Sequence, residues 1–432
     1  MLPLTRTASL VSLLVVQLVA CSPNGTKHGD SSSPPKDTDT GDDPDTGDDP
    51  PAPPCDGESW GAIADPDSAI HVRVDGDDTH DGSSDAPVHT LARALELSRT
   101  SIGAVIAMGP GSFPTTAALT AGSEGDDDLT LVGCSATESE LIADDTTVPV
   151  LDIDGTIGLT VSNLTISGGT IGIHARDTAA VHLSELQIIG PATAGLAHAG
   201  GYSLVENVHI EGIVPVSTSG TTQSDIGYGI YAHGGTIELQ GVTVSGATSA
   251  GIVVRSATAN IEEVQVVGTL ADSNGLLGRG IQLEDYCEAT VLDTVVQGNA
   301  DAGLYSLRST QLSIEGLEVS GVTASACPTC DSDGTGDGIV ITRGDSTAAV
   351  STFQTTLSDN LVTDADRTGI LLAGVTATLS GNSCTGCGAT VDGSALVSQD
   401  SAVVTGTDTV GDVTATGVDA FATFADTLEA VE

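Results

Sequence analysis

The chain has 432 residues and a formal net charge of −47 at pH 7, with 59 acidic residues against 12 lysines and arginines. A charge of this size repels phosphate backbones and anionic head groups, which excludes nucleic acid and acidic lipid surfaces as electrostatic partners. Because only 2% of the residues are aromatic, a core must be built from small aliphatic side chains rather than large rings.

Residues 1–20 have the layout of an export signal. One charge, Arg6, precedes an apolar run that is too short to span a membrane. The run ends in "LVAC" at Cys21, which resembles the lipobox of bacterial lipoproteins. The resemblance implies lipid attachment at Cys21, and Ser22 after it implies a position in the outer membrane or on the cell surface. The alternative is an ordinary cleaved signal that is followed by an incidental cysteine.

Residues 21–54 consist mainly of Asp, Thr, Gly, Pro and Ser, as in "DTDTGDDPDTGDDPPAPP". Such a segment buries too little apolar surface to offset the entropy of ordering it. The composition predicts a disordered, self-repelling tether. Its aspartates allow loosely bound calcium, and we expect no cofactor.

A repeated pattern predicts the fold of the rest of the chain. A glycine followed by Ile or Leu and a short β-rich run recurs, and a second run that ends in a turn glycine follows, as in "TIELQGVTVSG". The repeated glycines are Gly172, Gly195, Gly229, Gly251, Gly280, Gly303, Gly338 and Gly369. The glycines are 22 to 35 residues apart, and units this short cannot bury their apolar faces alone and must stack. The pattern is similar to the coils of right-handed parallel β-helix proteins, the pectate-lyase-like superfamily, and predicts an all-β solenoid.

We expect an opening segment at 55–139 and the β-helix at 140–432. The sequence from Val72 to Ser98 resembles the strand, Asp/Gly loop and helix found ahead of many such β-helices. The helix is predicted near 88–99, with Leu91, Ala94, Leu95 and Ser98 on one face. It would cover the open strand edges of the first coil. Phe421 and Phe424 suggest a weaker cap at the other end.

The cysteines after Cys21 lie in an exported context that permits disulfides. Cys55 and Cys134 are the expected staple between the opening segment and the first coils. The pairs Cys327/Cys330 and Cys384/Cys387 lie about two coils apart, roughly 10 Å at ~4.8 Å per coil. That separation favours disulfides over a shared zinc ion, so no metal site is expected. Cys287 is left over, as a buried thiol or as the partner of a loop cysteine.

Alignment of the units on their glycines shows an alternation. The segment that leads into the strand is short in some units and long in others, and we call it the approach. A short approach places Ala194, Ala250 or Ala302 directly before the glycine, whereas a long approach places Tyr228, Arg279 or Asp337 there. The outward positions of the same strand collect most of the remaining basic and aromatic residues. These outward residues are His174, Tyr231, Gln282, Tyr305, Arg176, His233, Arg255 and Glu284, with Arg308 and Arg343 one step later.

Two interpretations of this face remain open. It is either a solvated corner with weak ion pairs or a groove for an extended ligand. In the second case the ligand-binding residues are Tyr228, Tyr231, Arg255, Arg279, Gln282, Tyr305 and Asp337. The three residues of the long approaches would recur about every 9.6 Å, close to the span of a disaccharide. A repeating polymer fits only if these side chains line up and face outward.

The evidence for catalysis in the sequence is weak. The nearest set of acid, base and cation candidates is Asp337, Arg279, Glu284 and Asp285, which match no known signature. His174, His198 and His233 lie at different offsets in their coils and are interpreted as surface histidines rather than metal ligands. The predicted function is a noncatalytic binding or structural module, displayed on the cell envelope, for an extracellular polymer or a partner protein. The alternative is a polysaccharide lyase or glycoside hydrolase that acts on an acidic polysaccharide.

Overall fold

The computed structural model describes residues 68–115, 117–120, 126–213, 215, 226–273, 275, 277–324, 335–388 and 394–406. The chain divides into two units, 1–51 and 52–432, and all the described residues belong to the second. The signal, the tether, and the residues Cys21, Cys55, Cys327, Cys330, Phe421 and Phe424 lie outside the described residues.

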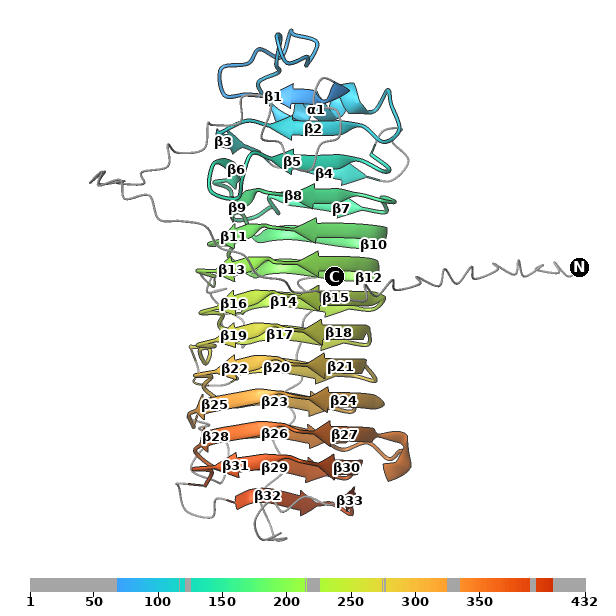
Figure 1. The fold of residues 1–432 in the computed structure, drawn as a ribbon, viewed down its shortest axis with the longest axis vertical. Helices are drawn as coiled ribbons and strands as arrows, with labels where there is room; N and C mark the ends of the chain where they lie inside the picture. The colour runs from blue at the N-terminus through green and yellow to red at the C-terminus, as the bar shows by residue number, and fades with distance from the viewer. Residues whose placement is uncertain are drawn as a thin grey trace, which may run out of the picture. The chain divides into compact units, whose positions relative to one another are not determined.

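The described chain is a stack of coils in which each full coil contributes one strand to each of three parallel columns (Figure 1). The first column holds β4 (Ala117–Thr120), β7 (Leu151–Asp154), the first halves of β10 (Ile171–Ser184) and β12 (Ala194–Glu206), β14 (Gly227–His233), β17 (Ser249–Arg255), β20 (Arg279–Glu284), β23 (Ala302–Leu307), β26 (Asp337–Thr342), β29 (Thr368–Ala373) and β32 (Ser394–Gln399).

The second column holds β1 (Ile70–Val72), β2 (Val105–Met108), β5 (Thr130–Gly133), β8 (Thr160–Ser162), the second halves of β10 and β12, β15 (Thr236–Gln240), β18 (Thr258–Glu262), β21 (Glu288–Leu292), β24 (Gln311–Glu315), β27 (Gln354–Ser358), β30 (Thr376–Ser380) and β33 (Val403–Gly406). The third holds β3 (Gly111–Pro114), β6 (Ser139–Ala143), β9 (Thr165–Gly168), β11 (Gln187–Ile189), β13 (His209–Glu211), β16 (Thr243–Ser245), β19 (Gln265–Val267), β22 (Val295–Gln297), β25 (Glu318–Val322), β28 (Leu361–Ala365) and β31 (Ser383–Thr385).

Stacked aliphatic side chains form the core, as the repeat predicted. The residue after each repeated glycine pairs in register with its equivalent in the next coil, and every one is buried. The glycine itself lies where the first column meets the third. A Cβ on Gly229 would lie 2.2 Å from Cγ1 of Val244 and 2.5 Å from the carbonyl oxygen of Gly251, so no side chain fits at this corner.

The β-helix begins earlier than predicted. Strand β2 pairs with β5 and β3 with β6, all in parallel, so much of the segment 105–139 already forms coils. The expected boundary at residue 140 is therefore too late. These first coils lack the repeated Gly-Ile or Gly-Leu step, which is why the pattern did not reveal them.

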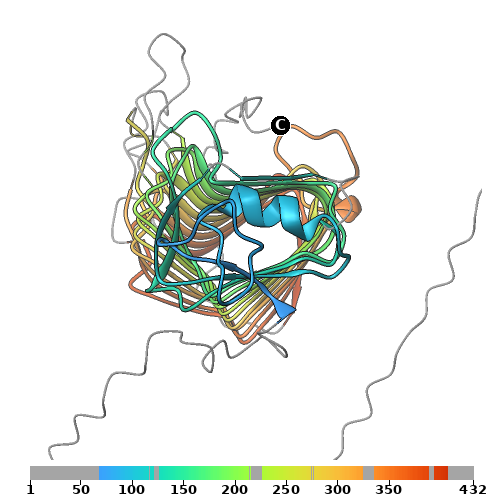
Figure 2. The same cartoon turned by 90° about the horizontal axis from the view of Figure 1, so that it is seen from above.

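The capping helix is present. Helix α1 (Leu91–Ser98) begins after Thr90, whose side chain accepts a hydrogen bond from the backbone N–H of Arg93 at 3.2 Å. Its buried residues are Leu91, Ala94, Leu95 and Ser98, the face that the sequence predicted. Figure 2 shows the helix lying across the end of the stacked coils. No helix in the described part of the chain is long and apolar enough to cross a membrane.

The described cysteines agree in part with the disulfide prediction. Cys384 and Cys387 are joined by a disulfide, with their Cα atoms 6.1 Å apart. Cys287 is buried and free. Cys134 is disulfide-bonded, but its expected partner, Cys55, lies outside the described residues. Among the described residues, no group of three or more His, Cys, Asp or Glu side chains is placed to hold a metal ion.

Candidate functional site

The outer face of the first column carries the alternation that the sequence predicted. Tyr228 pairs with Ala194 and Ala250, Ala250 with Arg279, and Ala302 with Asp337. The side chains thus lie in one row along the axis. They are not open to solvent, however, because Tyr228, Arg279 and Asp337 are only 2%, 4% and 0% exposed. The expectation of an outward-facing row for a repeating polymer is therefore wrong.

Arg279 shows how the side chains of this row are engaged. Its Nε lies 2.8 Å from Oδ2 of Asp301, and its Nη1 donates to Oε1 of Gln282 at 3.0 Å. The guanidinium also lies 3.7 Å from the ring centroid of Tyr305, a cation–π contact. Three residues predicted to bind a ligand therefore bind one another. Tyr231 is likewise buried, and its ring stacks on that of Tyr228 at 5.9 Å.

Asp337, one of the acid candidates, is also paired with an internal partner. Arg367 donates to both carboxylate oxygens, with Nε 2.9 Å from Oδ1. Burial raises the pKa of the Asp337 carboxyl, and the hydrogen bonds and charge of Arg367 oppose that rise. Glu284 is buried as well. Glu284 and Asp285 both pair with Arg255, whereas Arg279 pairs with Asp301. The four catalytic candidates therefore do not come together as an exposed acid–base pair.

A second group of basic residues lies at the end of the first-column strands, and we call Arg176, Arg255, Arg308 and Arg343 the arginine corner. One row of paired residues along the axis contains Arg176, Ala199, His233, Arg255 and Glu284, and it continues through Leu307 and Thr342. Arg308 and Arg343 are the residues that directly follow Leu307 and Thr342 in the chain. The side chains of Arg176, Arg255 and Arg308 are 36%, 28% and 29% exposed. Arg343 is half-buried. The predicted ligand-binding residue Arg255 is therefore accessible where the others are not.

Asp285 links two members of this corner across three coils. Its Oδ2 lies 2.9 Å from Nε of Arg255, and its Oδ1 lies 3.0 Å from Nε of Arg308. Arg343 instead donates from Nη1 to the carbonyl oxygen of Ala348 at 3.2 Å. The corner thus presents guanidinium donors and carboxylate acceptors that are already held in position.

The N-terminal end of the same corner holds an Asp–His–Arg group. Asp152 on β7 lies 3.3 Å from Nδ1 of His174 and 2.9 Å from Nη2 of Arg176, both on β10. The hydrogen bond from His174 is the main cause that lowers the pKa of Asp152, and the charge of Arg176 adds to it. Asp152 was not among the predicted site residues because it precedes the first repeated glycine, Gly172.

His174, His198 and His233 lie in three different rows of the coils. His198 is fully buried inside the coils, and its Nδ1 lies 2.9 Å from Oγ of Ser203. Burial lowers the pKa of His198 to about 4, so it is neutral at pH 7. The interpretation of His198 as a surface histidine is therefore wrong. His233 lies in the row of Arg255 at the arginine corner.

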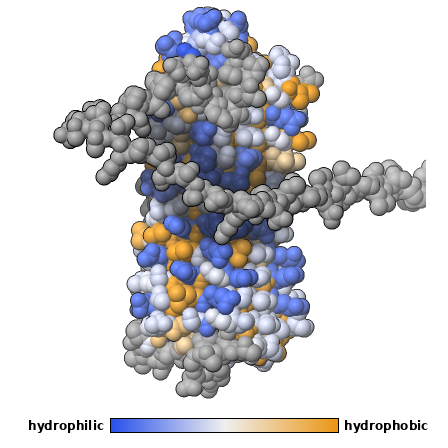
Figure 3. All heavy atoms as spheres, in the orientation of Figure 1, coloured by the Kyte–Doolittle hydropathy of each residue, from blue (hydrophilic) through white to orange (hydrophobic). Residues whose placement is uncertain are grey.

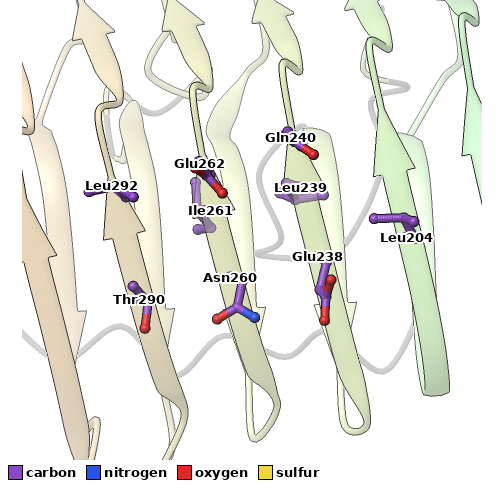
Figure 4. A pocket seen from close by; sticks show the side chains of 9 residues that line it. All are labelled: Leu204, Glu238, Leu239, Gln240, Asn260, Ile261, Glu262, Thr290 and Leu292. Atoms are coloured by element: carbon purple, nitrogen blue, oxygen red, sulfur yellow. The ribbon is translucent and has the colours of Figure 1, made fainter. Parts of the chain in front are cut away.

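A shallow depression of about 170 Å³ lies on the outer face of the second column (Figure 4). Its polar lining comes from Glu238, Gln240, Asn260, Glu262 and Thr290. No basic or aromatic side chain lines it, in contrast to the arginine corner. The face in Figure 3 shows hydrophobic residues only in short patches among hydrophilic ones.

Residues 150–319 match the family model described as a right-handed β-helix region. No curated protein sequence matches the chain. Solved structures with similar coils include the catalytic domain of a GH87 alpha-1,3-glucanase (10% identity, 85% of this chain and 70% of that chain, TM-score 0.43). Also similar is an alginate lyase from Paenibacillus sp. str. FPU-7 (14% identity, 72% of this chain and 97% of that chain, TM-score 0.40). A third is the pectate lyase Pel9A (12% identity, 80% of this chain and 79% of that chain, TM-score 0.45). At these identities no residue role is transferred. With its three parallel columns and this family-model match, the described chain is a right-handed parallel β-helix.

Proposed function

We propose that this β-helix is a noncatalytic module that binds an extended extracellular polysaccharide along the arginine corner. We further propose that it is held at the cell envelope by a lipid on Cys21 and by the tether 21–54. One observation carries the binding proposal. The chain has no lysine after Lys36, and four of the six arginines that follow residue 150 lie at this one corner. The other two, Arg279 and Arg367, are buried or nearly so in ion pairs.

The chemistry of the corner suits the hydroxyl groups of a sugar. A polysaccharide needs donors and acceptors that alternate along its length, and rigid strands hold such groups at a fixed spacing of ~4.8 Å. Three successive coils provide such groups: the guanidiniums of Arg255 and Arg308 are donors, and the carboxylate of Asp285 between them is an acceptor. Because their charges largely compensate, the corner does not attract polyanions, and the net charge of −47 repels them. We therefore expect an uncharged polysaccharide.

Affinity electrophoresis of the full-length chain tests this proposal. Gels would contain dextran, xylan, β-glucan, polygalacturonate or alginate. We expect retention by at least one uncharged polymer and about tenfold weaker retention of the double variant Arg255→Gln/Arg308→Gln, since two charge-assisted hydrogen-bond donors are lost. Arg93→Gln, on the exposed side of α1, is the matched control and should bind like the wild type. Wild-type mobility that is unchanged by every polymer would refute the proposal.

A second function, a polysaccharide lyase or hydrolase, is favoured by the Asp152–His174–Arg176 group. A carboxylate that orients an imidazole beside a guanidinium supplies a base and a cation, the parts that proton abstraction next to a sugar carboxylate requires. Incubation with polygalacturonate and alginate, followed by measurement of unsaturated and reducing ends, tests it. Product that forms with the wild type and is lost in His174→Gln would establish catalysis and replace the first proposal.

A further inference from the structure

The turn between β20 and β21 is longer than the equivalent turn in the preceding coil. Arg255 pairs with Glu284 and Thr258 with Glu288, so the two residues 256–257 lie opposite the three residues 285–287. Cys287 is buried in the core like its equivalent Ala257, whereas Tyr286 points outward and is 57% exposed. Tyr286 is the one aromatic side chain of the described coils that is mainly exposed.

The backbone of this turn is strained. Asp285 and Tyr286 have φ values of 52° and 67°, in the left-handed region that bulky side chains rarely adopt. Two coils earlier, Gly234 and Gly235 both have a φ of 67° at the corresponding corner. A tyrosine thus occupies a conformation that glycine adopts without strain, and strain of this kind is concentrated at functional sites.

Contacts on both sides hold the strained turn in place. The backbone N–H of Tyr286 donates to the carbonyl oxygen of Arg308 at 3.0 Å, and Oγ of Ser256 donates to the carbonyl oxygen of Asp285 at 2.9 Å. The ring of Tyr286 lies 6.5 Å from that of the buried Phe353, at an interplanar angle of 30°. The ring is therefore supported on one side and open to solvent on another.

We infer that Tyr286 is a stacking platform for an uncharged pyranose ring at the arginine corner, an inference that rests on the function proposed above. A pyranose carries C–H groups on its faces and hydroxyls around its rim. The C–H face packs on the aromatic ring, and the hydroxyls reach Asp285, next in the chain, and the guanidinium of Arg308. The platform and the Arg255–Asp285–Arg308 group together form one subsite for a sugar residue.

Replacement of Tyr286 separates binding from folding. Tyr286→Gly removes the ring and also relieves the left-handed strain, so this variant should unfold at a temperature no lower than the wild type. We expect it to bind dextran, xylan or β-glucan, whichever retains the wild type, about tenfold more weakly. Tyr286→Trp should restore binding. Tyr202→Ala, a half-buried tyrosine on the second half of β12, is the control and should bind normally.

The outcomes distinguish the platform from the proposed function. If the wild type binds no polysaccharide, both fail. If the wild type and Tyr286→Gly bind an uncharged polymer equally well, the platform alone is overturned. Retention only by polygalacturonate or alginate, weakening as salt is added, would overturn the uncharged ligand, because a sugar without charge forms no ion pair for salt to screen.

Discussion

At the scale of single residues, His198 makes folding sensitive to acid. Its side chain points into the core between Ala175 and Ala232 of the neighbouring coils, and burial lowers its pKa from 6.5 to about 4. The unfolded chain takes up a proton below pH 6.5, whereas the folded chain does so only near pH 4. The stability linked to His198 is complete above pH 6.5 and is lost as the pH falls through this window.

We therefore expect the wild type to lose about 2–3 kcal/mol of unfolding free energy from this residue between pH 7 and pH 4.5. His198→Ala should be less stable at pH 7 because it leaves a cavity, but it should lose correspondingly less on acidification. Urea unfolding at the two pH values measures the difference. Equal acid losses in the two proteins would show that His198 does not titrate in this way.

The buried pair Asp337–Arg367 gives a second residue-scale prediction. Arg367→Met leaves a buried carboxylate without its counter-charge and should destabilise the fold by about 3–5 kcal/mol. The double variant Asp337→Leu/Arg367→Met removes both charges and should recover most of that loss. Arg93→Met breaks the exposed pair with Glu96 and should cost less than about 1 kcal/mol. A double variant as unstable as the two single changes added together would contradict this account.

At the scale of the strand and its corner, the repeated glycines should be intolerant of any side chain. A Cβ on Gly251 would lie 2.3 Å from Cγ1 of Val266 and 2.7 Å from the carbonyl oxygen of Gly280. Gly251→Ala should therefore cost about 1–3 kcal/mol or more. Gly268→Ala meets nothing within 4 Å but has a φ of 67°, and should cost only about 1 kcal/mol. Chemical denaturation of both variants measures the contrast, and equal costs would argue against a close-packed corner.

The same glycines explain how far the sequence predicts the strands. Because a corner that excludes Cβ requires glycine in every coil, the requirement is visible as a repeat, and the register of Tyr228, Arg279 and Asp337 followed from it. The first coils are built on strands such as β5 and β7 without that glycine, so their position could not be predicted. The burial of Arg279 and Asp337 could not be predicted either. It depends on their ion-pair partners Asp301 and Arg367, which lie outside the strand pattern.

Tyr286 shows the same limit on a smaller scale. Its exposure results from one additional residue in a turn, which becomes evident only when Arg255 and Thr258 are paired with their partners in the next coil. The sequence did contain a signal of the longer turn: the segment "LEDYCEA" at 283–289 has one residue more than the equivalent segment "VRSATA" at 254–259. The alternation of inward and outward positions predicts side-chain direction within a strand, but it does not extend through a turn of a different length.

At the scale of the whole β-helix, each coil pairs only with its neighbours, so stability is distributed along one axis. The two ends of such a stack have one neighbour instead of two and should open before the middle. At the N-terminal end, α1 buries Leu91 and Leu95 against the first coil, where it contacts β1 and β2. The helix therefore replaces the missing neighbour and covers apolar side chains that would otherwise meet water.

Leu95→Ala should weaken this cap without unfolding the rest. Truncation of a buried leucine typically costs about 2–5 kcal/mol, and in a stack of nearest-neighbour contacts the loss should fall on the coils next to the helix. We expect amide hydrogen exchange in β1 and β2 to accelerate by about thirtyfold or more, the factor for about 2 kcal/mol, while β17 and β20 exchange as in the wild type. Glu96→Ala, on the exposed side of α1, should leave all rates nearly unchanged. If exchange instead rises equally in every coil of Leu95→Ala, the β-helix opens as a single cooperative unit, and α1 stabilises the whole stack rather than its first turns.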